Sequence, residues 1–82
     1  MNETTMKDQV RTVIIRTFGL AGNEDTNNLR LGSVPRWDSM GHMQLIPEVE
    51  NAFGVTFPAY ALAELVDVDS IVRAIQQYKV DR

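Results

Sequence analysis

The sequence of 82 residues contains no cysteine. A chain without thiols forms no disulfide, has no thiolate nucleophile of its own, and cannot build cysteine-based zinc or iron–sulfur sites. The sequence also lacks an apolar run that approaches the roughly 18 residues of a membrane-spanning helix. Its first residues lack the basic and apolar regions of a secretory signal. We therefore expect a cytoplasmic protein without a membrane span.

Histidine is also scarce, and the glycines form no phosphate-binding pattern. The single histidine, His42, has no second imidazole with which to chelate a metal, so we expect a solvated or half-packed helical residue. Asp67 and Asp69 begin like a calcium loop, but the glycine and glutamate that such a loop requires are replaced by other residues. Those positions hold Val72 and Tyr78. The five glycines never form the GxGxxG or GxxxxGK patterns that cradle phosphates, and we expect no metal site.

Positive charge is scarce as well, with 8 lysines and arginines against 11 aspartates and glutamates and a formal net charge of −3. Residues 1–37 carry five basic and four acidic side chains, whereas residues 38–82 carry three basic and seven acidic ones. An acidic half without a basic recognition helix disfavours contact with phosphate backbones, so we expect no nucleic-acid binding. The same charge favours partners with a basic surface. The simpler alternative is that these carboxylates only keep a small domain soluble.

Apolar residues, in contrast, are present at a normal 44% and follow a helical pattern. The length fits one domain, which we place at residues 1–82. Apolar side chains at spacings of three and four residues predict three longer helices at residues 4–18, 39–52 and 69–78, and a short helix at residues 59–65. No segment has convincing strand character. The pattern therefore predicts an all-α fold built as a small helix bundle.

A polar stretch at residues 21–38 is predicted to be a long loop between the first and second helices, because it is rich in turn-forming residues. Connections of this length are usually functional or held to the core by their own side chains. The expected anchors are Leu29, Leu31, Val34 and Trp37. Trp37 supplies the largest apolar area in the chain, so packing is its expected role.

The second predicted helix has an expected inward face and one internal conflict. The inward residues are Met43, Leu45, Ile46, Val49 and Phe53. Asp38 and Ser39 are both N-cap types, and glycines at 19 and 54 are placed to end the first and second helices. Pro47 lies inside the second helix, where proline removes a backbone hydrogen bond and clashes with the preceding turn. We therefore expect a kink there, or irregular first turns.

Ser39 lies where the long loop enters the second helix, so we expect an exposed hydroxyl. The free N–H groups and partial positive charge of a helix N-terminus suit an attached phosphate. The simpler alternative is a serine that only caps the helix. Nucleophilic catalysis is disfavoured, because Trp37 replaces the first glycine of the G-x-S-x-G motif and so small a bundle has little room for a dry pocket. We expect no catalytic residue and no enzyme activity.

Several short motifs follow one another at defined offsets. Asp38-Ser39-Met40 is followed by apolar residues at helical spacing, by the stretch FGVTFP at residues 53–58, and by a closing amphipathic helix. This ordered set spans nearly the whole chain and resembles the acyl carrier protein family. The resemblance implies a four-helix acyl-carrier-like bundle, with three longer helices, one short helix and a long loop between the first two. It also leads us to expect a monomer.

The resemblance further implies a cofactor. Ser39 would carry 4'-phosphopantetheine through a phosphodiester, transferred from coenzyme A by a holo-acyl-carrier-protein synthase or another phosphopantetheinyl transferase. Asp38 matches the motif acid that helps to position the transferase's magnesium. The thiol of the arm would hold acyl or aminoacyl groups as thioesters. The chain would then deliver a tethered intermediate to each partner enzyme rather than turn over substrate.

In the family, the second helix is the usual docking element for partner enzymes. The partners expected here are a loading ligase and the acyltransferases or synthases of fatty acid, polyketide or other specialised biosynthesis. The residues expected to contact them are Met40, Met43, Glu48, Glu50 and Trp37.

The sequence departs from the fatty-acid members of the family along this helix. Those members carry a denser row of carboxylates, several positions of which are here Gly41, His42, Gln44 and Pro47. Residues 38–45 are more similar to the D-alanyl carrier proteins of cell-wall synthesis and other stand-alone carriers, some of which are loaded by an adenylate-forming ligase. We expect a stand-alone carrier, with excision from a larger synthase as the alternative. An aminoacyl carrier and a helical interaction module without the arm stay open, as does the cargo.

Overall fold

The computed structural model describes residues 3–20 and 29–79. These residues form three α-helices, α1 (Glu3–Phe18), α2 (Ser39–Phe53) and α3 (Val68–Tyr78), with a 3₁₀-helix, η1 (Ala59–Glu64), between α2 and α3. The two described ranges contain no strand, and one isolated antiparallel bridge pairs residues 30 and 67. The predicted all-α class is therefore confirmed. Each observed helix end lies within one residue of its predicted end.

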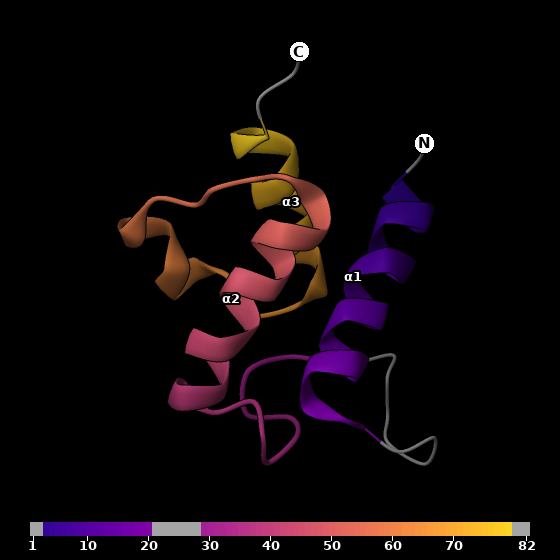
Figure 1. The fold of residues 1–82 in the computed structure, drawn as a ribbon, viewed down its shortest axis with the longest axis vertical. Coiled ribbons are helices and arrows are strands. Elements are labelled where there is room, and N and C mark those ends of the chain that lie inside the picture. Colours follow the sequence, from indigo (N-terminus) through magenta and orange to yellow (C-terminus); the bar gives the residue numbers. More distant parts are fainter. Residues whose placement is uncertain (1–2, 21–28, 80–82) are drawn as a thin grey trace.

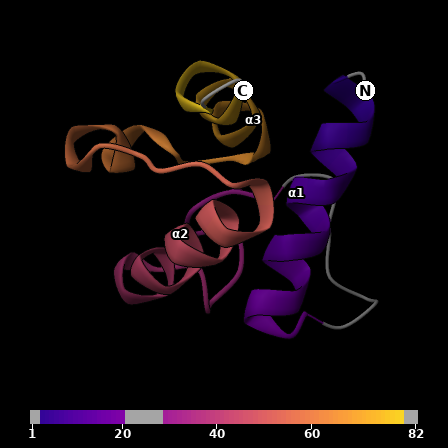
Figure 2. The same ribbon diagram turned by 45° about the horizontal axis from the view of Figure 1, so that its top comes forward.

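α1 packs against both of the other α-helices, α2 and α3 (Figures 1 and 2). The segment that contains η1 lies on the side of the molecule away from α1 (Figure 1). The first turn of α2 lies at the opposite end of the molecule from the first turn of α1 and the last turn of α3. No described helix has the length and apolar character needed to cross a lipid bilayer.

One hydrophobic core joins the helices to the described part of the α1–α2 connection. Its largest fully buried side chains include Trp37, Phe18, Ile14, Leu29, Leu45, Leu65, Ile71 and Ile75. Three of the four predicted anchors are buried: Leu29, Val34 and Trp37. The prediction for Leu31 is wrong, since its side chain is 38% exposed. Leu31 opens a surface turn, and its N–H donates to the carbonyl of Val66 at 2.7 Å, which holds the backbone but leaves the side chain at the surface.

The buried stripe of α2 contains Gly41 and His42, which were not predicted, while the predicted Phe53 is only half-buried. Leu45, Ile46 and Val49 are buried as predicted. Met43 is 65% exposed, so its prediction as a core residue is wrong. His42 is buried on this stripe instead. At about 100° per residue, positions 41, 42, 45, 46 and 49 lie on one face of the helix, and Met43 lies outside that face.

The ends of α1 and α2 are formed by glycines, as predicted. Gly19 and Gly54 have φ angles of 61° and 65°, a left-handed conformation that favours glycine. The N–H of Leu20 donates to the carbonyl of Ile15 at 3.1 Å and satisfies one of the last carbonyls of α1. α2 runs without interruption through Pro47. Pro47 is exposed, so water can reach the carbonyl that the proline leaves without a donor.

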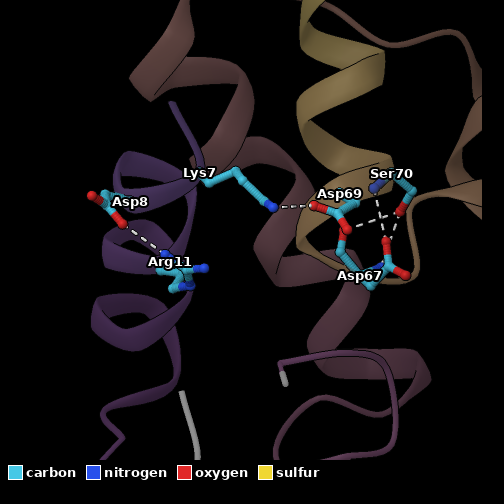
Figure 3. Close-up of polar contacts among 6 residues, drawn as sticks. All are labelled: Lys7, Asp8, Arg11, Asp67, Asp69 and Ser70. Atoms are coloured by element: carbon cyan, nitrogen blue, oxygen red, sulfur yellow. Dashed lines mark hydrogen bonds and ion pairs between the residues drawn. The ribbon is translucent and has the colours of Figure 1, made fainter. Parts of the chain in front are cut away.

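The start of α3 is held by a capping box (Figure 3). Oδ1 of Asp67 accepts the N–H of Ser70 at 2.7 Å, and Oγ of Ser70 accepts the N–H of Asp67 at 3.0 Å. The backbone hydrogen bond from Ser70 lowers the pKa of the Asp67 carboxyl below its ordinary value of 3.8. Lys7 of α1 pairs with Asp69 of α3 at 3.0 Å, an exposed ion pair that adds little stability but joins the two helices.

Candidate functional site

Asp38 is the N-cap of α2. Its backbone is extended, with φ of −107° and ψ of −166°, and its Oδ1 accepts the N–H of Gly41 at 2.8 Å. Its carbonyl accepts the first intrahelical bond, from the N–H of His42 at 2.8 Å. The predicted aspartate cap is thus confirmed. Of the two candidate N-cap residues, Asp38 and Ser39, Asp38 caps the helix.

Ser39 is consequently the first helical residue and not the cap. Its side chain is exposed, and its hydroxyl makes no hydrogen bond within the part of the chain that the structure describes. The simpler expectation of a serine that only caps the helix is therefore wrong. Apart from the capping carboxylate of Asp38, the first turn of α2 carries no acidic side chain, and the positive end of the helix dipole lies beside this hydroxyl.

Behind the serine, Trp37 and His42 form a buried hydrogen-bonded pair. Nε1 of Trp37 donates to Nδ1 of His42 at 3.0 Å, and Nε2 of His42 lies 2.9 Å from the carbonyl oxygen of Leu62 in η1. Trp37 is 0% exposed and His42 is 9% exposed. The expectation of a solvated or half-packed histidine is wrong, because both ring nitrogens have partners inside the protein. The signal that could have found this pair is the indole N–H of a core tryptophan, which requires a nearby acceptor.

This pairing also separates the histidine from the serine. A nucleophilic serine needs a general base within hydrogen-bond reach. Both nitrogens of His42 are engaged elsewhere, by Trp37 and by Leu62. His42 is therefore not placed to act as a base toward Ser39 in this conformation.

Gly41 permits the start of α2 to pack closely on its neighbours. A Cβ built at this position would lie 1.8 Å from the carbonyl oxygen of Arg36 and 3.1 Å from Cε1 of Phe18. The guanidinium of Arg36 donates to the carbonyl of Phe18 at 2.7 Å, at the end of α1. The turn that carries Ser39 is thereby fixed against both the preceding segment and α1. The sequence signal for this close approach is a glycine in the first turn of a helix.

The five predicted docking residues differ in exposure. Met40 is 76% exposed and Met43 is also largely exposed, while Glu48 lies on the solvent side of α2. Trp37 has no exposed surface to offer a partner. Glu50 is partly buried, and its Oε2 accepts the N–H of Phe57 at 2.8 Å, which fixes the turn after α2. Three of the five side chains are therefore available for contact in this conformation.

The described residues contain no group of three or more His, Cys, Asp or Glu side chains that could hold a metal ion. Comparison with known proteins finds that no family model, no curated protein and no solved structure matches this chain.

Proposed function

We propose that this chain is a carrier protein of the acyl carrier type, which bears 4'-phosphopantetheine on Ser39. The observation that carries the proposal is the exposed Ser39 hydroxyl, which takes no part in capping and lies at the positive end of α2. A phosphodiester at this oxygen would be stabilised by the dipole and by free backbone N–H groups. The order of the helices and the motif Asp38-Ser39-Met40 also support the proposal.

The modification is a group transfer from coenzyme A. The Ser39 oxygen forms a bond to the phosphorus next to pantetheine, the pyrophosphate linkage breaks, and the nucleotide half of coenzyme A leaves. The proton of the hydroxyl goes to a base of the transferase, because His42 is occupied. Asp38, adjacent to the acceptor, would help to position the transferase's magnesium.

The absence of cysteine fits this role. The working thiol would be that of the arm, which holds acyl or aminoacyl groups as thioesters. A chain without cysteine has no internal thiol that could take the cargo from the arm by exchange.

Partner enzymes would dock on the exposed side of α2. Met40 and Met43 provide flexible apolar contacts next to Ser39, and Glu48 provides a carboxylate for a basic partner surface. Trp37 and Glu50 would support this surface without contacting the partner. Trp37 packs in the core, and Glu50 accepts the N–H of Phe57. The expected partners are the transferase, a loading ligase, and acyltransferases or synthases.

The limited acidity of α2 favours one kind of cargo as a second candidate function. With the carboxylate of Glu50 engaged, Glu48 is the remaining acidic side chain of α2 available to a partner. This favours an aminoacyl carrier loaded by an adenylate-forming ligase over a fatty acid carrier. Mass spectrometry of the loaded protein from its own host distinguishes the two: an amino acid on the arm supports the second function, and a fatty acyl or polyketide unit excludes it.

The modification itself is tested with coenzyme A, magnesium and a broad-specificity phosphopantetheinyl transferase. We expect the mass of one arm to be added to the wild type and to Ser33→Ala, and no addition to Ser39→Ala. Ser33 is the matched control, because it is an exposed serine in the preceding turn. An unmodified wild type, or a mass gain that survives Ser39→Ala, would refute the proposal in favour of a helical interaction module.

A further inference from the structure

Three parts of the chain meet at the His42 ring. Trp37 lies before α2, His42 is the fourth residue of α2, and Leu62 belongs to η1. The indole N–H of Trp37 can only donate, so Nδ1 of His42 must accept with its lone pair. The carbonyl of Leu62 can only accept, so Nε2 must carry the proton. Only the neutral Nε2–H form of the imidazole satisfies both partners.

The 3₁₀-helix η1 is weakly stabilised from within, and its contacts with the rest of the fold include Leu62 against the core and a side-chain hydrogen bond between Tyr60 and Tyr78 of α3. It is six residues long, its N-cap Pro58 makes no side-chain cap bond, and of its residues only Ala61 is buried. Short 3₁₀ segments have poorer hydrogen-bond geometry than α-helices and depend on their surroundings. Within the described residues, the bond between His42 and Leu62 is the only side-chain hydrogen bond that joins α2 to η1.

We infer that His42 is a positioning residue, whose neutral ring holds both Trp37 and η1 against the first turns of α2 and so fixes the part of α2 on which the transferase of Ser39 would dock. This lock has two sides, because the ring that holds η1 also holds Trp37 at the entry to α2. The hydrogen bonds of the ring within the described residues go to Trp37 and Leu62 and not to Ser39. The docking part of this inference depends on the proposed carrier function, whereas the lock itself does not.

The lock has a spectroscopic signature in the unmodified wild-type chain. The nitrogen chemical shifts of the single histidine distinguish the Nε2–H tautomer from the Nδ1–H tautomer and from the charged ring. We expect the Nε2–H form at neutral pH, with a slowly exchanging ring proton and an indole proton of Trp37 that is also protected. A Nδ1–H or charged ring would overturn the inference without any variant being made.

Hydrogen exchange tests whether the ring holds η1. The variant His42→Leu removes both bonds, and Gln44→Leu is its matched control, an exposed position on the same helix. We expect at least a tenfold faster exchange of the Ala61 and Leu65 N–H groups in His42→Leu, with those of α3 unchanged, and wild-type rates in the control. Equal rates at η1 in the two variants would overturn the lock.

Two amide variants separate the two sides of the ring and remain informative if His42→Leu does not fold. His42→Gln places an amide N–H near the position of Nε2, whereas His42→Asn places an amide group near that of Nδ1. We therefore expect His42→Gln to restore much of the protection of η1 and His42→Asn to restore little. The reverse order would contradict the assigned direction of the bonds.

Transfer kinetics test the docking consequence. For His42→Leu we expect the KM of the transferase for the chain to rise several-fold with kcat nearly unchanged, because the serine is intact but its surroundings are loose. His42→Gln should recover a KM near that of the wild type. An unchanged KM in His42→Leu would refute the positioning role. Failure to load even the wild type would refute the proposed function, while the tautomer and exchange results would still decide the lock.

Discussion

The starts of α2 and α3 have the same cap but differ in where the serine lies. Both helices follow an extended aspartate whose Oδ1 accepts an N–H three residues later, from Gly41 at 2.8 Å in α2 and from Ser70 at 2.7 Å in α3. In α3 the serine occupies that third position and closes a capping box with Asp67. In α2 the serine follows the aspartate directly and makes no such bond.

The comparison shows that the role of a serine hydroxyl at a helix start depends on whether the serine is the first or the third helical residue. At the third position it bonds back to the cap and becomes part of the fold. At the first position it is directed to solvent while the aspartate still caps. The second helix can therefore offer a hydroxyl for modification without losing its own start. The following predictions alter the elements that differ between the two starts.

The largest effect on stability is expected at the third position of α2. Gly41→Ala would place a Cβ 1.8 Å from the carbonyl of Arg36, so the backbone of the preceding turn must move. We expect a loss of about 3 kcal/mol in the free energy of unfolding, measured by urea denaturation with Trp37 fluorescence. Ser70→Ala, at the same position of α3, should lose only about 1 kcal/mol. Equal losses would show that the third positions are equivalent.

The two caps should be similar in stability and different in function. Asp38→Ala and Asp67→Ala each remove one cap, so each should lower the free energy of unfolding by about 1 kcal/mol. We expect Asp38→Asn to keep the cap but to load much more slowly, since it lacks the charge proposed to position magnesium. Asp67→Asn should load at the wild-type rate. A single mass-spectrometric time course compares them, and equal loading rates would remove Asp38 from the proposed function.

The α3 start should also show a pH dependence. The pKa of Asp67 is lowered in the folded chain, chiefly by the N–H of Ser70, so the folded state binds this proton less readily than the unfolded state. Its contribution is therefore complete above about pH 4 and is lost as the pH falls through the lowered pKa. Urea denaturation from pH 6 to pH 2 should give a steeper loss for the wild type than for Asp67→Asn. Parallel curves would exclude this contribution.

The smallest effect on stability is expected when the first turn of α2 is given an acid like that of α3. The second position holds exposed Met40 in α2 and Asp69 in α3. Met40→Asp places an acid in the first turn of α2, so we expect a gain of about 0.5 kcal/mol from the helix dipole. Loading should nevertheless slow, because a negative charge then lies beside the phosphate acceptor and an apolar contact is lost. Met40→Gln is the uncharged control, and unchanged loading in Met40→Asp would place docking elsewhere.

Local features of the sequence were sufficient for much of the fold. The helical spacing of apolar residues placed all four helices, and Gly19, Gly54 and the aspartate caps marked their ends. These signals act within a few residues along the chain, which is why they can be read without a partner. The same reasoning located Ser39 at a helix start. It did not decide between Asp38 and Ser39 as the cap, because both residue types fill that role.

The features that were missed depend on parts of the chain that are distant in sequence. His42 is buried where Trp37 and the carbonyl of Leu62 both bond to its ring, and Met43 lies outside the buried face of α2. Glu50 is held by Phe57 after the chain has turned. No local pattern reports such partners, since periodicity gives the face of a helix but not the polar groups that will face it.

The sequence by itself determined the helices, the acidic second half, the lack of a thiol and the motif in which Ser39 lies. The tertiary structure decided that this serine is exposed and uncapped, that Gly41 is required by a close approach of Arg36, and that the histidine beside it belongs to the core. The physical reason is that helix formation follows from neighbouring residues. The availability of a side chain depends instead on which distant groups pack against it or bond to it.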